Sequence, residues 1–278
     1  MAKATKHSKK NNKRSQADQA DRHHCYEASV QDPESELEFV SETFLELSGR
    51  PLKSLREDFC GTANTACAWV QQDAAHQAVG VDLDGEVMAW GKAHHVADLD
   101  ASARNRISMV QADVLSYSGE RVDAILAMNF SYYLFTTREG LRDYFKNALK
   151  GLKTDGILFL DAFGGYEAHQ ELEERTEYDD FTYVWDQAAF NPINQHMTCR
   201  IHFEFSDGSE MQNAFEYHWR LWTLPEIREL LLEAGFASAT IYWEGTDEET
   251  GEGDGIYSPT EQGDADAGWI AYLVACKS

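Results

Sequence analysis

The stretch Leu55–Ala63 constrains the fold of this chain more than any other part of the sequence. Apolar residues lead into the acidic pair Glu57 and Asp58, and a tight Cys-Gly-Thr turn follows them. Beyond the turn, apolar residues recur at helical spacing as far as Val70, so the stretch predicts a strand, a loop and a helix. In an α/β sheet such a loop lies at the carboxyl end of its strand, where helix N–H groups and a bare glycine backbone can approach a ligand closely. A small-molecule cofactor is therefore expected at this loop.

Strands and helices alternate after the loop. The predicted elements are strands at residues 78–83, 107–113, 122–128 and 156–161, and helices at residues 85–94 and 141–152. An amphipathic helix precedes the first strand, with Asp32 as its N-cap, Pro33 as its first residue and Gly49 at its end. Strands that alternate with helices form parallel, doubly wound sheets. We therefore predict a Rossmann-like α/β fold, with helices on both faces of a mostly parallel seven-stranded sheet.

The alternation stops between residues 166 and 221, where aromatic residues recur at period two. Asp207 and Gly208 separate two such stretches and are typical of a hairpin turn. We predict an antiparallel β insertion, at about residues 166–221, that covers one mouth of the sheet.

One helix and two strands follow the insertion. Thr223 and Glu226 form a capping box at the start of the helix, and a glycine ends it. Residues 237–243 and 269–275 are predicted as a C-terminal antiparallel strand pair. The acidic, glycine-rich loop between them, residues 245–268, is expected to be mobile.

Charge divides the chain into a basic tail and an acidic body. The formal net charge at pH 7 is −24, although the first fourteen residues contain six Lys and Arg side chains and no acidic one. Residues 1–22 are polar and lack an apolar period, so we expect a disordered basic tail before an ordered domain at residues 23–278. Because nucleic-acid affinity needs clustered Lys and Arg, the acidic body disfavours a nucleic-acid partner, while the tail leaves contact with RNA, DNA or an acidic partner open.

The sequence also predicts a compartment and the state of the thiols. No segment has the apolar run of a signal peptide or of a membrane-spanning helix, so we expect a cytoplasmic protein that does not bind a membrane. The five cysteines are scattered and form no C-x-x-C pair, which predicts reduced thiols. None of the ten histidines stands at metal-ligand spacing from a cysteine or carboxylate cluster, so no metal site is predicted.

With these elements in place, residues 26–278, and most clearly 55–163, resemble the class I S-adenosylmethionine-dependent methyltransferases. The first motif of that family is commonly acidic-x-Gly-Cys-Gly-Thr-Gly, and the loop keeps the acid and the Cys-Gly-Thr. Phe59 and Ala63 replace the first and last glycines, so the backbone cannot copy every left-handed conformation without cost. Glu57 aligns with the acid of the motif and Asp58 is adjacent, so both remain candidates for it.

The resemblance implies that S-adenosyl-L-methionine is the cofactor. Asp82, which ends the second strand, resembles the acid that binds the ribose hydroxyls, and Asp113 resembles the acid that meets the adenine amino group. The cofactor-binding residues that it implies are Arg56, Glu57, Asp58, Phe59, Cys60, Gly61, Thr62, Asp82, Leu83, Asp113, Val114, Asn129 and Phe130. The candidate catalytic residues are Tyr26, Asn129, Tyr132 and Tyr133, with Tyr26 on a leading segment that could fold over the site.

We therefore predict an S-adenosylmethionine-dependent methyltransferase that acts on a small-molecule N or O acceptor by in-line displacement. An amine acceptor needs only to lose a proton, whereas a hydroxyl acceptor needs a general base. The aromatic residues of the insertion either line an acceptor pocket or pack one face of its sheet. They are Tyr183, Trp185, Phe203, Phe205, Tyr217, Trp219 and Trp222.

Three other functions fit parts of the sequence. A noncatalytic cofactor-binding or interaction protein would explain the degenerate glycine loop. A nicotinamide-dependent oxidoreductase also has an acid after its second strand, but this chain lacks the G-x-G-x-x-G pattern. A nucleic-acid methyltransferase is disfavoured by the acidic body. The sequence does not specify an oligomeric state.

Overall fold

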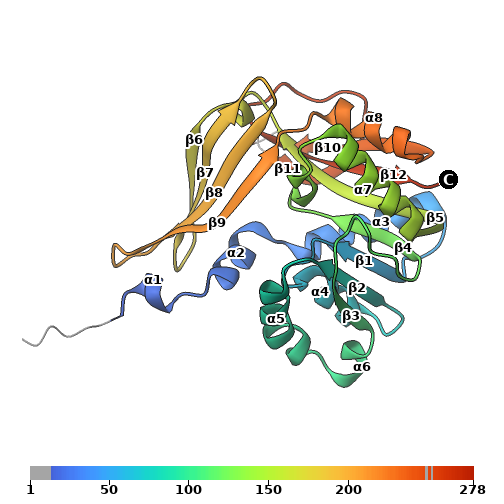
Figure 1. Ribbon diagram of the computed structural model, residues 1–278, viewed down its shortest axis with the longest axis horizontal. Helices are drawn as coiled ribbons and strands as arrows, with labels where there is room; N and C mark the ends of the chain where they lie inside the picture. The colour runs from blue at the N-terminus through green and yellow to red at the C-terminus, as the bar shows by residue number, and fades with distance from the viewer. Residues whose placement is uncertain (1–13, 248–249, 252) are drawn as a thin grey trace, which may run out of the picture.

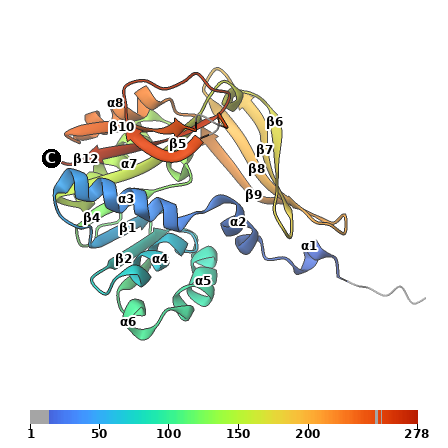
Figure 2. The same cartoon turned by 180° about the vertical axis from the view of Figure 1, so that it is seen from behind.

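Two β-sheets organise the protein, whose computed structural model describes residues 14–247, 250–251 and 253–278. Over these residues the main sheet has eight strands in the order β11-β10-β12-β5-β4-β1-β2-β3, and the second sheet has four in the order β6-β7-β8-β9. The second sheet projects from one end of the main sheet, and the N-terminal helices run beneath it toward α5 (Gly85–His94) (Figures 1 and 2).

The main sheet is parallel over five strands and antiparallel over the rest. Its strands are β1 (Ser54–Asp58), β2 (Gln77–Asp82), β3 (Ile107–Gln111), β4 (Val122–Ala127), β5 (Leu152–Gly164), β10 (Ser238–Thr246), β11 (Gly253–Pro259) and β12 (Trp269–Cys276). Strands β3, β2, β1, β4 and β5 pair in parallel, and β12 pairs antiparallel to both β5 and β10. This confirms the predicted Rossmann-like sheet with an antiparallel C-terminal pair.

Strand β11 is a correction to the sequence prediction. It pairs antiparallel with β10 inside the segment 245–268, which we expected to be a mobile loop. Its side chains are almost all exposed, so the sequence shows no apolar alternation there. The extra strand gives the main sheet eight strands instead of the predicted seven.

Helices cover both faces of the main sheet. They are α3 (Pro33–Ser48), α4 (Asn64–Gln72), α5 (Gly85–His94), α6 (Ala101–Arg104), α7 (Arg138–Gly151) and α8 (Leu224–Ala234), with 3₁₀ turns η1 (Val96–Asp98), η2 (Ser131–Leu134) and η3 (Glu167–His169). Tyr144 of α7 and Leu230 of α8 belong to the core on one face, whereas Phe44 of α3 and Trp69 of α4 belong to the core on the other. None of the helices in the described part of the chain is long and apolar enough to cross a bilayer.

The helix ends follow the predicted capping chemistry. The Asp32 carboxylate accepts a hydrogen bond from the Ser35 N–H, and Gly49 closes α3 in the left-handed conformation. Thr223 and Glu226 form a reciprocal capping box at α8, and Gly235 ends that helix, also left-handed. These local signals are readable in the sequence because each cap satisfies N–H or C=O groups that the helix itself leaves unpaired.

The second sheet is the predicted insertion. It is an antiparallel meander of β6 (Leu172–Glu177), β7 (Thr182–Asn191), β8 (His196–Glu204) and β9 (Glu210–Arg220), placed between β5 and α8. The sequence does not predict strand β6, because β6 is an edge strand whose side chains, apart from Leu172, are exposed. In β9 the aromatic residues Phe215, Tyr217 and Trp219 alternate along the strand, so they share one face.

The N-terminal segment is more ordered than the sequence predicts. Helices α1 (Gln16–Gln19) and α2 (Arg22–Val30) lie within or next to the predicted disordered tail, so that prediction is wrong for residues 16–22; residues 1–13 lie outside the described part of the chain. The Gln16 N–H donates to Asp207 and the Ala17 N–H to Ser209, both in the β8–β9 turn. Contacts between such distant parts of the chain leave no local pattern in the sequence.

Candidate functional site

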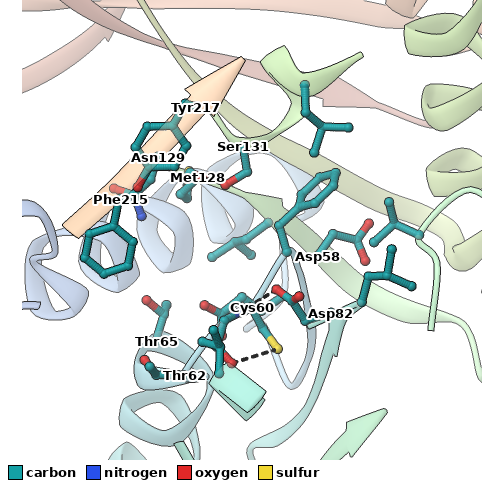
Figure 3. A pocket seen from close by; sticks show the side chains of 18 of the residues that line it. Asp58, Cys60, Thr62, Thr65, Asp82, Met128, Asn129, Ser131, Phe215 and Tyr217 are labelled. Carbon is teal, nitrogen blue, oxygen red and sulfur yellow. Dashed lines mark hydrogen bonds between the residues drawn. The ribbon is translucent and has the colours of Figure 1, made fainter. Parts of the chain in front are cut away.

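The first cavity lies at the carboxyl ends of β1, β2 and β4 and has a volume of about 610 Å³. Strand β9 and helix α2 close it from the side of the insertion, and Figure 3 shows Phe215 and Tyr217 across from Asp82 and Thr62. The predicted site residues in its wall are Tyr26, Glu57, Asp58, Phe59, Cys60, Gly61, Thr62, Asp82, Leu83, Asp113, Val114 and Asn129. The structure therefore brings together twelve residues that the sequence spreads over about a hundred positions.

The β1–α4 loop keeps left-handed backbone conformations without the usual glycines. The φ angles of Phe59 and Ala63 are both +59°, and that of Gly61 is +51°. The Phe59 ring packs against Tyr144 at 5.4 Å and against Phe135 at 6.1 Å between ring centroids. Left-handed conformation costs a residue with a side chain roughly 1–2 kcal/mol, and this packing offsets part of that cost. The loop thus has Phe59 and Ala63 in backbone conformations that glycine adopts more readily.

The two candidate acids of the loop have different surroundings. Asp58 is buried, and its carboxylate pairs with Arg56 at 2.8 Å and accepts a hydrogen bond from the Tyr144 hydroxyl at 3.0 Å. Glu57 accepts one hydrogen bond, from the Ala66 N–H at 2.9 Å to Oε2. Burial, with the nearby charges of Glu36, Asp82 and Asp58, raises the pKa of Glu57 to about 8. Asp58 therefore already has a positively charged partner inside the fold, whereas Glu57 has none and could pair with a cationic ligand.

Arg56 does not reach the cavity. Its side chain is buried, it pairs with Asp58, and it lies over the Tyr117 ring at 5.5 Å. The structure gives it a role inside the fold, which differs from the predicted contact with a cofactor.

Asp82 and Asp113 stand at the ends of neighbouring strands. Asp82 accepts from the Gly61 N–H and from the Asp84 N–H, each at 2.8 Å, so its carboxylate is fixed by the loop and by its own turn. Asp113 accepts from the Leu115 N–H at 2.9 Å through Oδ1. A carboxylate oxygen has more than one lone pair, so both acids can still accept hydrogen bonds from a ligand in the cavity.

A further acid, Asp161, fixes the backbone after β4. The Asn129 N–H donates to its Oδ2 at 2.7 Å and the Phe130 N–H to its Oδ1 at 2.9 Å, which holds both residues at left-handed φ angles of 56° and 55°. Burial raises the pKa of Asp161 to about 7, against the opposing effect of these two hydrogen bonds. The sequence places Asp161 at the end of the fifth strand, but nothing there marks it as a partner of Asn129.

Tyr132 and Tyr133 are core residues, which corrects the predicted catalytic role. Both side chains are fully buried, and neither lines the first cavity or the aromatic cavity beside it. The Tyr132 hydroxyl donates to the Asp161 carbonyl at 2.8 Å and the Tyr133 hydroxyl to the Phe163 carbonyl at 3.2 Å. Their hydrogen bonds support the turn that presents Asn129.

Helix α2 covers the first cavity and is tied to both of its sides. The Glu27 carboxylate accepts from the Thr62 hydroxyl at 2.6 Å, and the His95 Nε2 lies 2.7 Å from the same oxygen. The Trp90 indole donates to Asp21 at 2.8 Å, and Tyr26 packs against Phe215 at 4.9 Å. The leading segment therefore folds over the site, as expected for Tyr26.

Sequence reasoning missed Glu27, Glu36 and Phe215. Glu36 lines the first cavity, and burial raises its pKa to about 8. Its position one turn before Val40, on the buried face of α3, is a signal that could have identified it. Glu27 has no such signal, because its partners come from the loop and from the end of α5.

A second cavity, of about 430 Å³, adjoins the first. The two share Tyr26, Asn129, Tyr217 and Trp219, which we call the junction. Aromatic rings make up much of the wall of the second cavity; besides those of the junction they are Phe130, Phe163, Tyr183, Trp185 and Trp269. Four of the predicted acceptor-pocket aromatics thus line a cavity (Tyr183, Trp185, Tyr217 and Trp219), whereas Phe203, Phe205 and Trp222 pack in the cores.

Both cavities are acidic. Among the described residues, the charged groups in the wall of the first cavity other than histidine are all carboxylates, and so are those of the second. An acidic cavity attracts a cationic ligand and disfavours an anionic one.

Comparison with known proteins extends this picture. No protein-family model matches the chain. Over 196 residues the chain is 22% identical to YqeM of Bacillus subtilis (strain 168), which carries a provisional methyltransferase name; the match covers 68% of this chain and 76% of that protein.

Several solved structures resemble this chain over nine tenths or more of its length. An S-adenosylmethionine-dependent methyltransferase from Clostridium acetobutylicum ATCC 824 superimposes with a TM-score of 0.66 at 15% identity, over 91% of this chain and 96% of that one. CalS10, an amino pentose methyltransferase from Micromonospora echinaspora, gives 0.64 at 14%, over 92% and 96%. KedS8, a sugar N-methyltransferase from Streptoalloteichus sp ATCC 53650, gives 0.61 at 16%, over 100% and 98%. At such identities these likenesses establish the architecture.

Proposed function

We propose that this chain, which has the fold of the class I S-adenosylmethionine-dependent methyltransferases, transfers a methyl group from S-adenosyl-L-methionine to a small-molecule nitrogen acceptor. The observation that carries the proposal is the placement of Glu57, Asp82 and Asp113 around one cavity at the carboxyl ends of β1, β2 and β3. Ligands of open α/β sheets bind at this edge.

The residues of the first cavity fit this cofactor. Asp82 would accept the ribose hydroxyl protons and Asp113 the adenine amino group, each with the lone pairs left by its backbone partners. Glu57 would pair with the ammonium of the methionine moiety, and the surrounding carboxylates suit a ligand with a cationic sulfonium. When bound, S-adenosyl-L-methionine supplies a methyl group on a sulfonium that leaves as a neutral thioether. The chain supplies alignment and exclusion of water.

The junction favours nitrogen over oxygen as the methylated atom. Burial raises the pKa of the Tyr26 hydroxyl, and it raises that of Tyr217 too, so both stay protonated at neutral pH. The remaining junction residues, Asn129 and Trp219, are not bases. A hydroxyl acceptor would need a base at this place, whereas an amine can lose its proton to water before it attacks. CalS10, an amino pentose methyltransferase, and KedS8, a sugar N-methyltransferase, agree with an amine acceptor.

Calorimetry with the purified protein tests the cofactor. We expect S-adenosyl-L-methionine to bind the wild-type chain and Asp82→Ala to weaken binding about 10- to 100-fold, because the ribose loses charge-assisted hydrogen bonds. The matched control is Asp98→Ala, an exposed acid on the nearby turn η1. If the cofactor does not bind, or if Asp82→Ala binds it as well as Asp98→Ala does, the proposal fails.

A second measurement separates an enzyme from a cofactor-binding protein. Incubation with an amine library and methyl-labelled cofactor should yield methylated product in mass spectra, and NAD should not change the melting temperature. The joining of two cavities at the junction supports the enzyme, since a protein that only bound cofactor would have no need of the second one. Tight cofactor binding without any transfer to the library would favour the noncatalytic alternative.

A further inference from the structure

The second cavity holds groups that would recognise a ligand. Its volume lies in the range of sites for small organic molecules. Ring centroids of Phe130 and Phe163 lie 4.7 Å apart, those of Phe163 and Trp185 6.4 Å, and those of Trp185 and Trp219 6.2 Å. These rings form a continuous wall that begins at the junction, through Trp219. Such a wall binds an apolar body by burial, and a cation by the faces of its rings.

Among the described residues, the charged groups in the wall beyond the junction are all carboxylates, and a buried amide adds a hydrogen-bond acceptor. Gln187 is 5% exposed, and its amide Nε2 donates to the carbonyls of Glu167 and Gln170, each at 3.0 Å, which leaves Oε1 as the group that it can present to the cavity. Three carboxylates, those of Glu167, Glu174 and Glu244, stand in the same wall. Among the described residues none of the three pairs with a basic side chain.

The positions of these acids relative to the junction define the ligand. The carboxylates line the second cavity but not the first, so they lie away from the place where a nucleophile would meet the methyl group. We propose that the second cavity binds the methyl acceptor, and that this acceptor is an organic cation: its reacting nitrogen at the junction, its apolar body against the rings, and a second, positively charged group at the distal carboxylates. Acceptors with a carboxylate, phosphate or sulfate at that end are rejected. This inference rests on the proposed function.

The transfer step balances without any further reactant. The lone pair of a neutral nitrogen forms the new N–C bond, the C–S bond breaks with its electron pair going to sulfur, and a proton leaves the methylated nitrogen for water. A positive charge at the far end of the acceptor lowers the pKa of the reacting nitrogen, which helps that nitrogen to be neutral at the moment of attack.

Three matched benzylamines test the charge at the distal end. They carry an aminomethyl group, a methyl group or a carboxylate in the para position, and so differ only there. Titration calorimetry uses the full-length protein saturated with S-adenosylhomocysteine. We expect the aminomethyl compound to bind best and the carboxylate compound worst, with at least tenfold between the two ends of the series.

Variants of the carboxylates test whether these side chains cause the expected ranking of the three affinities. In the double variant Glu174→Gln, Glu244→Gln, the difference between the aminomethyl and carboxylate compounds should shrink at least fivefold. The control is Glu173→Gln, an exposed acid on the same strand β6 that pairs with Arg175 and does not line the cavity. It should leave the series unchanged.

Three results would overturn the inference: a carboxylate compound that binds as well as the aminomethyl one, a series unchanged by the double variant, or no binding of any of the three to the S-adenosylhomocysteine complex. If S-adenosylhomocysteine itself fails to bind, the proposed function fails first, and the two failures are thereby distinguished. Melting temperatures of the double variant and of Glu173→Gln show that both remain folded.

Discussion

Buried acids in the first cavity make cofactor affinity depend on pH. Burial raises the pKa of Glu57 to about 8 in the empty protein, so this carboxyl is largely protonated at neutral pH. An ammonium next to it would favour the ionised form, and binding would then release a proton. The affinity for S-adenosyl-L-methionine should therefore rise with pH up to the pKa of the empty protein, and level off above it.

The magnitude follows from that pKa. If the pKa of Glu57 in the complex lies below about 5.5, the association constant rises about 70-fold between pH 5.5 and pH 7.5, a free energy of about 2.5 kcal/mol. Glu36, whose pKa is also raised to about 8 by burial, would steepen the dependence if it ionises together with Glu57. A slope near one therefore indicates one acid, and a slope near two indicates both.

Calorimetry at several pH values, in buffers of different ionisation enthalpy, measures the affinity and the released protons directly. Glu57→Gln removes the titrating group with little change in shape, and it should bind weakly with a much flatter profile. Asp98→Ala, which lies on the surface, should reproduce the wild-type slope. An affinity that stays constant from pH 5.5 to 7.5, or a Glu57→Gln profile as steep as that of the wild type, would refute the pairing of Glu57 with the ammonium.

Further predictions concern stability and the cover of the site. Folding raises the pKa values of Glu36 and Glu57 from 4.5 to about 8, so the unfolded chain loses these protons at lower pH than the folded protein does. The protein without ligand should therefore lose stability as the pH rises from about 4.5 to 8. Differential scanning calorimetry should show a smaller loss for Glu57→Gln. Gly91→Ala would place a Cβ 2.1 Å from the Thr62 carbonyl oxygen, so urea denaturation should show a loss of about 1–3 kcal/mol from overpacking. Asp161→Asn leaves one of two backbone N–H groups without a carboxylate oxygen, which should cost about 1–3 kcal/mol in stability and lower the rate of transfer more than the affinity for cofactor. Trp90→Phe removes the hydrogen bond to α2 and should speed amide hydrogen exchange in residues 22–30 while the main sheet stays protected.

The sequence predicted the main sheet well because its strands are apolar and its helices carry explicit caps. Asp32 and Thr223 accept hydrogen bonds from helix N–H groups where the pattern placed them. The sequence prediction missed elements that are stabilised by contacts with distant parts of the chain. Strand β11 is exposed and glycine-rich, and it forms because β10 offers it an edge. Helix α1 has no buried residue, and its partners lie in a turn about 190 residues away.

The same distinction separates the parts of the site. Asp82 and Asp113 were found because an acid at the end of a buried strand is a local pattern. Tyr132 and Tyr133 also come shortly after a strand, yet their rings lie in the core, because the left-handed backbone of Asn129 and Phe130 redirects the chain. That redirection depends on Asp161, which reaches the turn from a neighbouring strand. The sequence of one strand does not show which side chain of a neighbouring strand will fix the turn that follows it.

The loop at the end of β1 shows why a motif can degrade in sequence while its geometry persists. Phe59 and Ala63 hold the left-handed conformations that glycine would adopt more easily, at a cost of roughly 1–2 kcal/mol each. The Ala63 methyl is fully buried, and the Phe59 ring packs on Tyr144, whose hydroxyl in turn binds Asp58. Burial of these side chains offsets part of the conformational cost. Glycine at these positions is therefore sufficient for the loop but not required, and the loop can be recognised by its backbone angles where its sequence no longer identifies it.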